Sequence, residues 1–140
     1  MALPDALLDR LRRVKLLALD VDGVLTDGRL YFQADGIEIK AFHTQDGHGL
    51  KLLKRVGIHV ALITGRDSPM VSQRAAALGI SHVHQGCEDK LTTLRALCQR
   101  LDITLEQGAY CGDDLPDLAP IKRAGVGITV PNAPDYMHTH

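Results

Sequence analysis

Short apolar runs alternate with segments of helical periodicity along most of the chain. Five apolar runs are candidates for strands, at residues 14–19, 58–63, 82–84, 108–111 and 126–130. Four segments with apolar residues three and four positions apart are candidates for helices, at residues 47–56, 68–78, 88–101 and 114–124. Strands that alternate with helices are typical of a parallel sheet. The pattern therefore predicts an α/β fold with a doubly wound, Rossmann-like parallel sheet.

Two of the predicted helices carry signals for where they begin, end or bend. Ser68 is a suitable N-cap, Pro69 fits the first helical position, and Gly79 stands just past the predicted end. Pro120 lies inside the last helical segment, and we expect it to bend or end that helix.

One stretch departs from the alternation of strands and helices. Residues 29–42 carry apolar side chains in a period of two around Ala34, Asp35 and Gly36, a pattern that predicts a β-hairpin. Two short strands cannot bury both of their faces by themselves. We therefore expect this hairpin to form a flap that packs outside the core sheet, against another subunit.

Length and composition limit the classes of protein that the chain can represent. With 140 residues, of which 45% are hydrophobic and 24% charged, it fits one globular domain over residues 1–140. A net charge of -1 gives no general attraction to nucleic acid or to an anionic membrane. No apolar run is long enough to span a bilayer, and the first 13 residues do not resemble a signal peptide. Three cysteines without paired spacing favour a reduced, cytoplasmic protein without a zinc site or a disulfide framework.

Acidic residues directly follow the first predicted strand. Asp20 and Asp22 are two positions apart, so both side chains point to one side of extended chain, and Gly23 lets the backbone turn sharply. Neighbouring carboxylates repel each other unless a cation or a proton lies between them. One carboxylate can then act as an ionised nucleophile on a metal ion while the other holds and releases a proton. A calcium-binding loop is disfavoured because its downstream Glu is missing, whereas a simple acidic turn remains an alternative.

The fourth predicted strand is also followed by carboxylates, at the edge of the sheet where open α/β folds bind ligands. Asp113 together with Asp20 makes a suitable pair of ligands for Mg2+. Asp114 and Asp117 have a structural alternative, because either could cap the following helix.

The second predicted strand ends in residues that suit a phosphate group. Thr64, Gly65 and Arg66 offer a hydroxyl, exposed backbone amides at a helix start, and a guanidinium. Lys90 begins a helix, where a cation opposes the helix dipole and is not the residue that capping favours. A solvated lysine is the ordinary alternative, and only the other motifs favour a phosphate-binding role.

Together these motifs resemble a known family. Segment 20–28 (DVDGVLTDG), Thr64 at a strand end, Lys90 and segment 112–117 (GDDLPD) occur in the order found in phosphatases of the haloacid dehalogenase superfamily. They span most of the chain. The details of segments 20–28, 42–49 (FHTQDGHG), 63–66 and 112–117 are most similar to the capless members that act on octulosonate phosphates in lipopolysaccharide precursor synthesis.

The resemblance implies a Mg2+-dependent phosphatase that works through an aspartyl phosphate. By position, Asp20 would be the nucleophile and a metal ligand. Asp22 would protonate the leaving alcohol, then deprotonate the hydrolytic water, and lend its backbone carbonyl to Mg2+. Asp113 would complete the metal site, with Asp114 and Asp117 in support.

The resemblance also implies how substrate is held. Thr64 and Lys90 would act in catalysis by holding the phosphoryl oxygens. The implied substrate-binding positions are Asp22, His43, Thr44, Gln45, Asp46, Gly47, Lys51, Gly65, Arg66, Arg74 and Lys90. A substrate with a carboxylate beside its phosphate accounts for the additional basic residues among them.

The spacing of the motifs bears on domain structure and assembly. The gaps from Asp22 to Thr64 and from Thr64 to Lys90 are too short for a separate cap domain, so we expect an open site in a single chain. Capless relatives form homotetramers in which hairpins pack together and a neighbour helps to close the site. They usually continue beyond the position of His140 with a helix and a glycine-rich tail, so we expect a truncated chain or an absent tail.

Three alternatives stay open on the sequence alone. A signalling receiver domain also carries an aspartyl phosphate, but on a later strand than the first. A non-catalytic phosphatase-like module would lack Asp20, Asp22 or Lys90, all of which are present. The same chemistry on another nonulosonate, such as a sialic acid 9-phosphate, is barely distinguishable, because sugar selectivity rests on few contacts.

Overall fold

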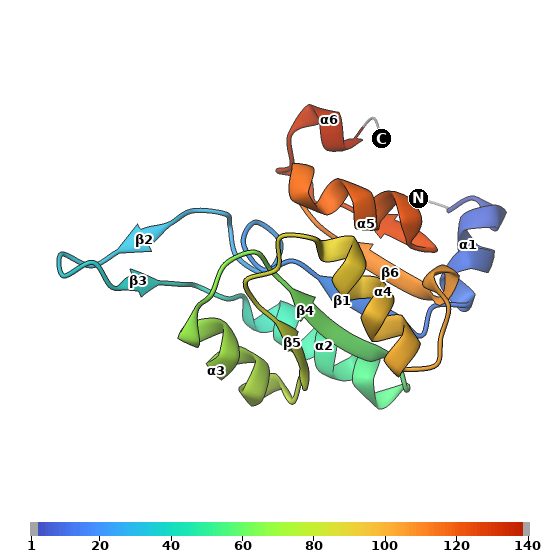
Figure 1. The fold of residues 1–140 in the computed structure, drawn as a ribbon, viewed down its shortest axis with the longest axis horizontal. Helices are drawn as coiled ribbons and strands as arrows, with labels where there is room; N and C mark the ends of the chain where they lie inside the picture. The colour runs from blue at the N-terminus through green and yellow to red at the C-terminus, as the bar shows by residue number, and fades with distance from the viewer. Residues whose placement is uncertain (1–2, 139–140) are drawn as a thin grey trace.

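The computed structural model describes residues 3–138, and its centre is a five-stranded parallel sheet (Figure 1). The strands are β1 (Leu16–Leu19), β4 (His59–Ile63), β5 (His82–His84), β6 (Gly108–Cys111) and β7 (Val126–Ile128). Each lies within two residues of its predicted bounds. Their order across the sheet is β5-β4-β1-β6-β7, so the chain builds one side outward from β1 and then the other. The predicted doubly wound sheet is confirmed.

The central strands end at the same level. Leu19 of β1 pairs with Leu62 of β4 on one side and with Cys111 of β6 on the other. Asp20 and Thr64 follow two of these strands directly. The register therefore brings the polar residues after the strands to one edge of the sheet.

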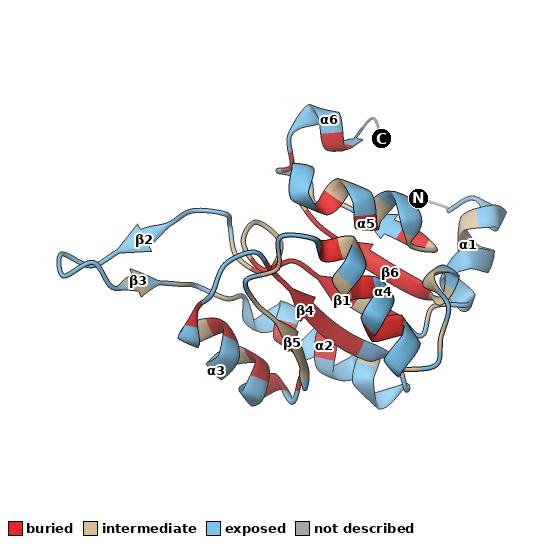
Figure 2. Cartoon of the chain, viewed as in Figure 1, coloured by how far each residue is buried: buried red, intermediate tan, exposed pale blue. Residues whose placement is uncertain are grey.

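Helices cover both faces of the sheet (Figure 1). Helices α2 (Thr44–Arg55) and α3 (Pro69–Leu78) pack on the face that Leu19 lines, and α4 (Lys90–Arg100) and α5 (Leu118–Arg123) pack on the face that Ala18 lines. The central strands β1, β4 and β6 are almost wholly buried (Figure 2), whereas β5 is half-buried and β7 is mostly exposed. Leu94 and Leu97 of α4 are completely buried. Truncation of such a leucine to alanine typically costs about 2–5 kcal/mol of stability.

Helix α2 begins earlier than predicted, at Thr44 instead of residue 47. The Nδ1 of His43 accepts a hydrogen bond of 3.0 Å from the backbone N–H of Gln45 and so caps the helix. The low helix propensity of Gly47 and Gly49 in its first turns hid this start from the sequence pattern.

The predicted single helix at 114–124 is wrong. The chain forms a short 3-10 helix, η2 (Leu115–Asp117), followed by α5. Pro120 is the third residue of α5, within the first turn, where it has no helical N–H bond to give up. The expectation that Pro120 bends or ends a helix is therefore also wrong.

Other helix ends agree with the sequence signals, and some elements were not predicted. Ser68 and Pro69 stand at the start of α3, and Gly79 ends it in a left-handed conformation. The sequence pattern missed α1 (Asp5–Arg12), which buries no residue, and the four-residue α6 (Asp135–His138), as well as the 3-10 helix η1 (Leu105–Gln107). The last two are too short for an apolar period, whereas α1 does carry Leu7, Leu8 and Leu11 at helical spacing and was overlooked.

The predicted hairpin is confirmed and projects from the body of the protein (Figure 1). Strands β2 (Tyr31–Phe32) and β3 (Glu38–Ile39) pair antiparallel, and the turn uses Gly36 at a φ of +87°. The hairpin is mostly exposed (Figure 2), including Phe32 at 58% and Ile37 at 60%. Within residues 3–138 no element forms a separate cap, and no helix is long and apolar enough to cross a membrane.

Candidate active site

A hollow of about 550 Å3 opens where the carboxyl ends of the central strands meet. It is lined by Asp20, Asp22, Thr64, Gly65, Arg66, Cys87, Glu88, Lys90, Asp113, Asp114 and Pro116. The four motifs that the sequence singled out therefore come together, although they are spread over nearly a hundred residues of the chain. The sequence analysis did not assign Cys87, Glu88 or Pro116 to the site, although they lie in or beside its motifs.

Asp20 is fixed by the end of β1. Its backbone N–H donates to the carbonyl of Cys111 at 2.9 Å, and its Oδ1 accepts the N–H of Val21 at 2.8 Å. Burial raises the pKa of Asp20 to about 7, and the charge of Asp117 adds to the rise while that of Lys90 opposes it. A positive charge beside Asp20 is therefore required to keep it ionised as a nucleophile.

Asp117 is only 1% exposed, and its carboxylate accepts hydrogen bonds from several groups of the site. Its Oδ1 accepts hydrogen bonds from the Lys90 ammonium at 2.8 Å and from the Tyr110 hydroxyl at 2.6 Å. Its Oδ2 accepts the backbone N–H groups of Asp113 at 3.1 Å and Asp114 at 3.4 Å. Four donors thus occupy the two carboxylate oxygens of Asp117, which leaves little capacity for a metal ion.

Lys90 lies between carboxylates at the start of α4. Its Nζ is 3.3 Å from the Oδ1 of Asp20 and is almost completely buried. Burial by itself lowers the pKa of Lys90, but the hydrogen bond to Asp117 and the charge of Asp20 outweigh this and raise it. Lys90 is therefore a permanent cation beside Asp20, and its burial argues against the alternative of a solvated lysine.

Three carboxylates could hold a metal ion in this hollow. One oxygen from each of Asp20, Asp113 and Asp117 lies within 4.8 Å of the others. Because Asp117 is already satisfied by hydrogen bonds, Asp20 and Asp113 are the available ligands and Asp117 supports them. Burial and the charge of Asp117 raise the pKa of Asp113, as expected for crowded carboxylates that lack a cation. This donor set of hard oxygens fits Mg2+.

Two glycines make the crowding possible. Gly23 has a φ of +86°, and a Cβ at this position would overlap the carboxylate of Asp113. A Cβ at Gly112 would overlap the side chain of Asp117. The motif glycines thus let the backbone approach the carboxylates closely.

Asp114 has the capping role that the sequence left as an alternative. Its Oδ1 accepts the N–H of Leu115 at 2.8 Å, at the start of η2, and also a hydrogen bond from the hydroxyl of Tyr136. These bonds lower the pKa of Asp114.

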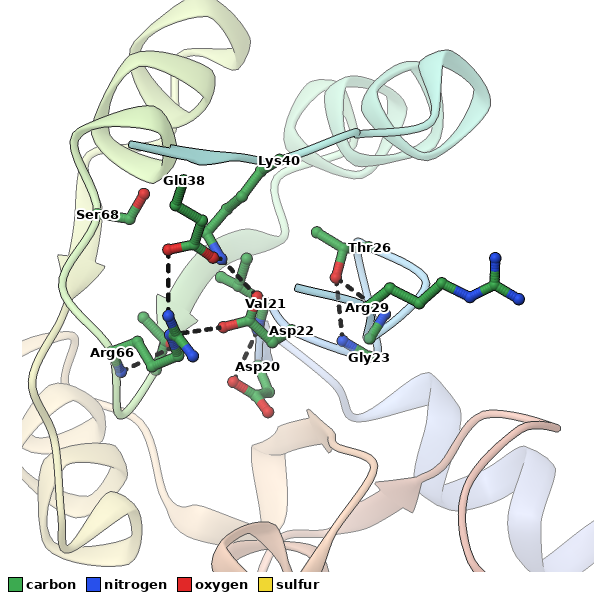
Figure 3. A network of polar contacts seen from close by, with 12 residues as sticks. Asp20, Val21, Asp22, Gly23, Thr26, Arg29, Glu38, Lys40, Arg66 and Ser68 are labelled. Carbon is green, nitrogen blue, oxygen red and sulfur yellow. Dashed lines mark hydrogen bonds and ion pairs between the residues drawn. The ribbon is translucent and has the colours of Figure 1, made fainter. Parts of the chain in front are cut away.

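Asp22 belongs to a second network, shown in Figure 3. Its Oδ1 accepts a hydrogen bond of 2.5 Å from Lys40, and its Oδ2 lies 4.0 Å from the Nε of Arg66. Glu38 pairs with both cations, at 2.9 Å from Lys40 and 3.1 Å from Arg66. The sequence analysis missed Glu38 and Lys40, although their spacing of two on the hairpin places them on one face.

Thr64 and the residues after it form the wall of the hollow beyond β4. Thr64 is buried, and its backbone pairs with the carbonyl of His84 and the N–H of Cys87, each within 3.0 Å. Its hydroxyl accepts the N–H of Arg66 at 3.4 Å. This arrangement presents a hydroxyl and the Gly65 backbone next to Asp20 and Lys90 in the same hollow.

The remaining predicted substrate-binding residues lie outside this hollow. His43 and Asp46 line a second hollow of about 340 Å3 beside α2. Arg74 of α3 donates to the carbonyl of His43 at 3.5 Å and stacks over Phe42, with its Cζ 5.9 Å from the ring centroid. Gly47 lies directly against the Arg74 guanidinium, which a Cβ at this position would overlap.

Three further residues of that set are on other parts of α2. Thr44 and Gln45 are exposed in its first turn. Lys51 lines a different hollow with Lys54 and Arg55 of the same helix. Within one chain, the structure thus brings together the catalytic and metal-binding candidates but not the whole predicted substrate set.

Comparison with known proteins identifies relatives of this arrangement. A family model for haloacid dehalogenase-like hydrolases matches residues 83–140. The 3-deoxy-D-manno-octulosonate 8-phosphate phosphatase of Haemophilus influenzae is 43% identical over 128 residues, covering 91% of this chain and 71% of the relative. The enzyme of that name from Escherichia coli K12 is 43% identical over 120 residues, and this chain spans 64% of its length.

A solved structure supports the same relationship. The 3-deoxy-D-manno-octulosonate 8-phosphate phosphatase of Moraxella catarrhalis was crystallised in complex with a magnesium ion, a phosphate ion and a KDO molecule. It is 52% identical and superposes with a TM-score of 0.88, covering 91% of this chain and 73% of that one.

Proposed function

We propose a function for this chain from the premise that it belongs to the haloacid dehalogenase-like hydrolases, in the family of the 3-deoxy-D-manno-octulosonate 8-phosphate phosphatases. The proposed reaction is Mg2+-dependent hydrolysis of 3-deoxy-D-manno-octulosonate 8-phosphate to the sugar acid and phosphate, a step of lipopolysaccharide precursor synthesis. The observation that carries the proposal is the meeting of Asp20, Lys90 and Asp113 in one open hollow. A receiver domain is disfavoured because the candidate nucleophile follows the first strand of the chain, whereas a receiver carries its phosphorylated aspartate on a later strand. The family assignment also excludes a receiver domain.

In the first half-reaction an oxygen of Asp20 attacks the phosphorus atom of the ester. The bond from phosphorus to the ester oxygen breaks, and Asp22 gives its proton to the departing alcohol. The products are an aspartyl phosphate on Asp20, the free sugar acid, and Asp22 as a carboxylate. A carboxylate nucleophile divides hydrolysis into two easier steps, and a positioned acid adds to the rate.

In the second half-reaction Asp22 works as the base. It takes a proton from a water molecule, whose oxygen attacks the phosphorus of the aspartyl phosphate. The bond from phosphorus to Asp20 breaks, phosphate is released, and both aspartates return to their starting protonation states. The position of Asp22, two residues after Asp20 in the chain, suits it to both steps.

Thr64, Gly65 and Lys90 are proposed to hold the phosphoryl oxygens during both steps. Their support is their place on the wall of the same hollow and the buried cation of Lys90. Phosphoryl transfer depends on such positioning and on positive charge around the equatorial oxygens.

Asp20, Asp113 and the backbone carbonyl of Asp22 are the proposed Mg2+ ligands, with Asp114 and Asp117 in support. When bound, Mg2+ supplies the positive charge that keeps Asp20 ionised and offsets the charge of the phosphoryl group. Asp117 contributes by holding Lys90 and the Asp113 backbone in place.

We also propose that the chain acts as one domain within a cytoplasmic homotetramer. The support is the exposed apolar surface of the hairpin, which includes Leu30, Phe32 and Ile37 and needs a partner. The predicted positions beside α2 would then contribute to substrate binding across an assembled site. These positions are His43, Thr44, Gln45, Asp46, Gly47, Lys51 and Arg74.

A panel of sugar phosphates tests the proposed function. Phosphate release is measured with 3-deoxy-D-manno-octulosonate 8-phosphate, a sialic acid 9-phosphate and glucose 6-phosphate, each with Mg2+ and with a chelator. We expect the highest kcat/KM for the octulosonate ester and no release with the chelator. A higher kcat/KM for the sialic acid ester would make that ester the substrate instead. If no ester releases phosphate, the proposal that the chain is a phosphatase is contradicted.

A further inference from the structure

Four charged side chains form a closed ring (Figure 3), and two of them, Asp22 and Arg66, also line the hollow. Lys40 contacts Asp22 at 2.5 Å and Glu38 at 2.9 Å, and Arg66 contacts Glu38 at 3.1 Å and approaches Asp22 to 4.0 Å. Charges of opposite sign therefore alternate around the ring. Two of its members, Glu38 and Lys40, come from the hairpin and not from the core sheet.

Lys40 is the member most strongly fixed by its surroundings. Its side chain is only 3% exposed, although it follows directly on the exposed hairpin. A buried ammonium is stable only when paired and hydrogen-bonded, and Asp22 and Glu38 supply the two carboxylates. The pairing orients Asp22 in return, because one of its two oxygens is bound by a side chain that is itself held by Glu38.

Glu38 has the second fixed position. Each of its oxygens binds a different cation of the ring, and its side chain is 13% exposed. Lys40 and Arg66, which Glu38 joins, face different oxygens of Asp22. The arrangement leaves the Oδ2 of Asp22 at 4.0 Å from Arg66, beyond hydrogen-bond distance.

We propose that Lys40, held by Glu38, is a positioning residue that orients the carboxyl group of Asp22 for proton transfer. This inference rests on the proposed function, in which Asp22 is the general acid and base. Lys40 acts through Asp22, and the hairpin is thereby a working part of the active site. A proton donor must lie within hydrogen-bond reach of the leaving oxygen, so loss of this orientation slows proton transfer.

The proposal predicts dependence on the leaving group. The alcohol of a sugar phosphate needs a proton as it departs, whereas para-nitrophenolate is stable as an anion and departs without one. Lys40→Met should therefore lower kcat/KM for the octulosonate 8-phosphate by about tenfold or more, a part of the roughly 10²–10⁴-fold that a general acid contributes. It should change kcat/KM for para-nitrophenyl phosphate little. A merely structural defect would lower both alike.

The experiment measures kcat/KM for both esters with wild type and with Lys40→Met, Lys40→Arg, Glu38→Gln and Lys122→Met. Lys40→Arg should restore part of the loss because it keeps the cation, and Glu38→Gln should show the same leaving-group dependence in weaker form. Lys122 is an exposed lysine of α5 and serves as the matched control, with wild-type values expected. Equal losses on both esters, or no loss on either, would overturn the proposal.

A double mutant separates action through Asp22 from any independent role. Asp22→Ala should show the leaving-group dependence itself, and adding Lys40→Met to it should cause no further loss on the octulosonate ester. An additive loss would contradict the proposal.

If Lys40→Met does not fold, as judged by circular dichroism, the leaving-group dependence of Glu38→Gln and Lys40→Arg tests the proposal in its place. Failure of the wild type to release phosphate from either ester would contradict the proposed function instead.

Discussion

Lys90 donates a hydrogen bond of 2.8 Å to the Oδ1 of Asp117, and both side chains are almost completely buried. The pair lies 27 positions apart in the chain and joins α4 to the segment after β6. Through it Lys90 is held beside Asp20, at 3.3 Å. The site thus has a buried support behind the residues that face substrate.

Removal of Asp117 is expected to destabilise the protein strongly. Asp117→Ala takes away the acceptor of four hydrogen bonds and leaves the Lys90 ammonium buried with less compensation. We expect the free energy of unfolding, from urea titration, to fall by about 3–5 kcal/mol. Asp114→Ala is the control, because it removes an exposed cap worth about 1 kcal/mol. Equal losses in the two variants would contradict the role of Asp117.

Magnesium is expected to stabilise the folded chain. A ligand that binds only the native state at about 100 times its Kd adds about 2.7 kcal/mol to the free energy of unfolding. We expect urea titrations with Mg2+ to show such an increase for wild type and for Asp9→Asn, an exposed carboxylate of α1. Asp113→Asn should lose most of it. A full increase in Asp113→Asn would place the metal elsewhere.

The backbone at Gly23 offers a paired test with Gly36. Both glycines have a positive φ, of +86° and +87°, but a Cβ would overlap Asp113 at Gly23 and would meet nothing within 4 Å at Gly36. Alanine at either position should cost about 1–2 kcal/mol through backbone strain. Gly23→Ala alone should lose the stabilisation by Mg2+, as measured in the same urea titrations. If Gly23→Ala keeps the stabilisation by Mg2+, the close approach of Gly23 to Asp113 is not needed for metal binding.

The histidines of β5 are expected to make stability depend on pH. Burial holds the pKa of His82 below its ordinary value of 6.5, and positive charge at His59, Arg100 and Lys54 adds to the effect. The unfolded chain therefore binds a proton at a higher pH than the folded chain. The contribution of His82 to stability should fall as the pH decreases through 6.5 and level off below its folded pKa, whereas Asp20, whose pKa is raised to about 7, contributes in the opposite sense.

Substitution identifies this contribution. As the pH falls from about 7 to 5, wild type should lose stability relative to His82→Asn, because the opposing contribution of Asp20 is the same in both proteins and cancels in their difference. His48→Asn, at an exposed position of α2, is the control and should follow the wild type. An unchanged pH dependence in His82→Asn would assign the effect to other groups.

Much of the fold follows from local sequence. The strands around Ala18 and Ala61 are continuous apolar runs, and a parallel sheet follows once such runs alternate with helices. The acidic motif at Asp20 and the Thr64 strand end could be placed because each depends on its own neighbours in the chain.

What the sequence did not reveal depends on distant contacts. Nothing near Lys40 indicates that its ammonium binds Asp22, 18 positions away. Likewise, the saturation of Asp117 depends on Tyr110 and Lys90, which reach it from two other elements. Such pairings are decided by tertiary packing, so residue types and spacing give no signal for them.

The most direct test of the account is covalent labelling of Asp20. Wild type and Asp20→Asn are mixed with Mg2+ and 3-deoxy-D-manno-octulosonate 8-phosphate that carries radioactive phosphorus, and the reaction is stopped in acid within one turnover. We expect transient label on the wild-type protein followed by free phosphate, and neither in the folded Asp20→Asn variant. Label on Asp20→Asn, or undiminished release of phosphate by it, would contradict Asp20 as the nucleophile.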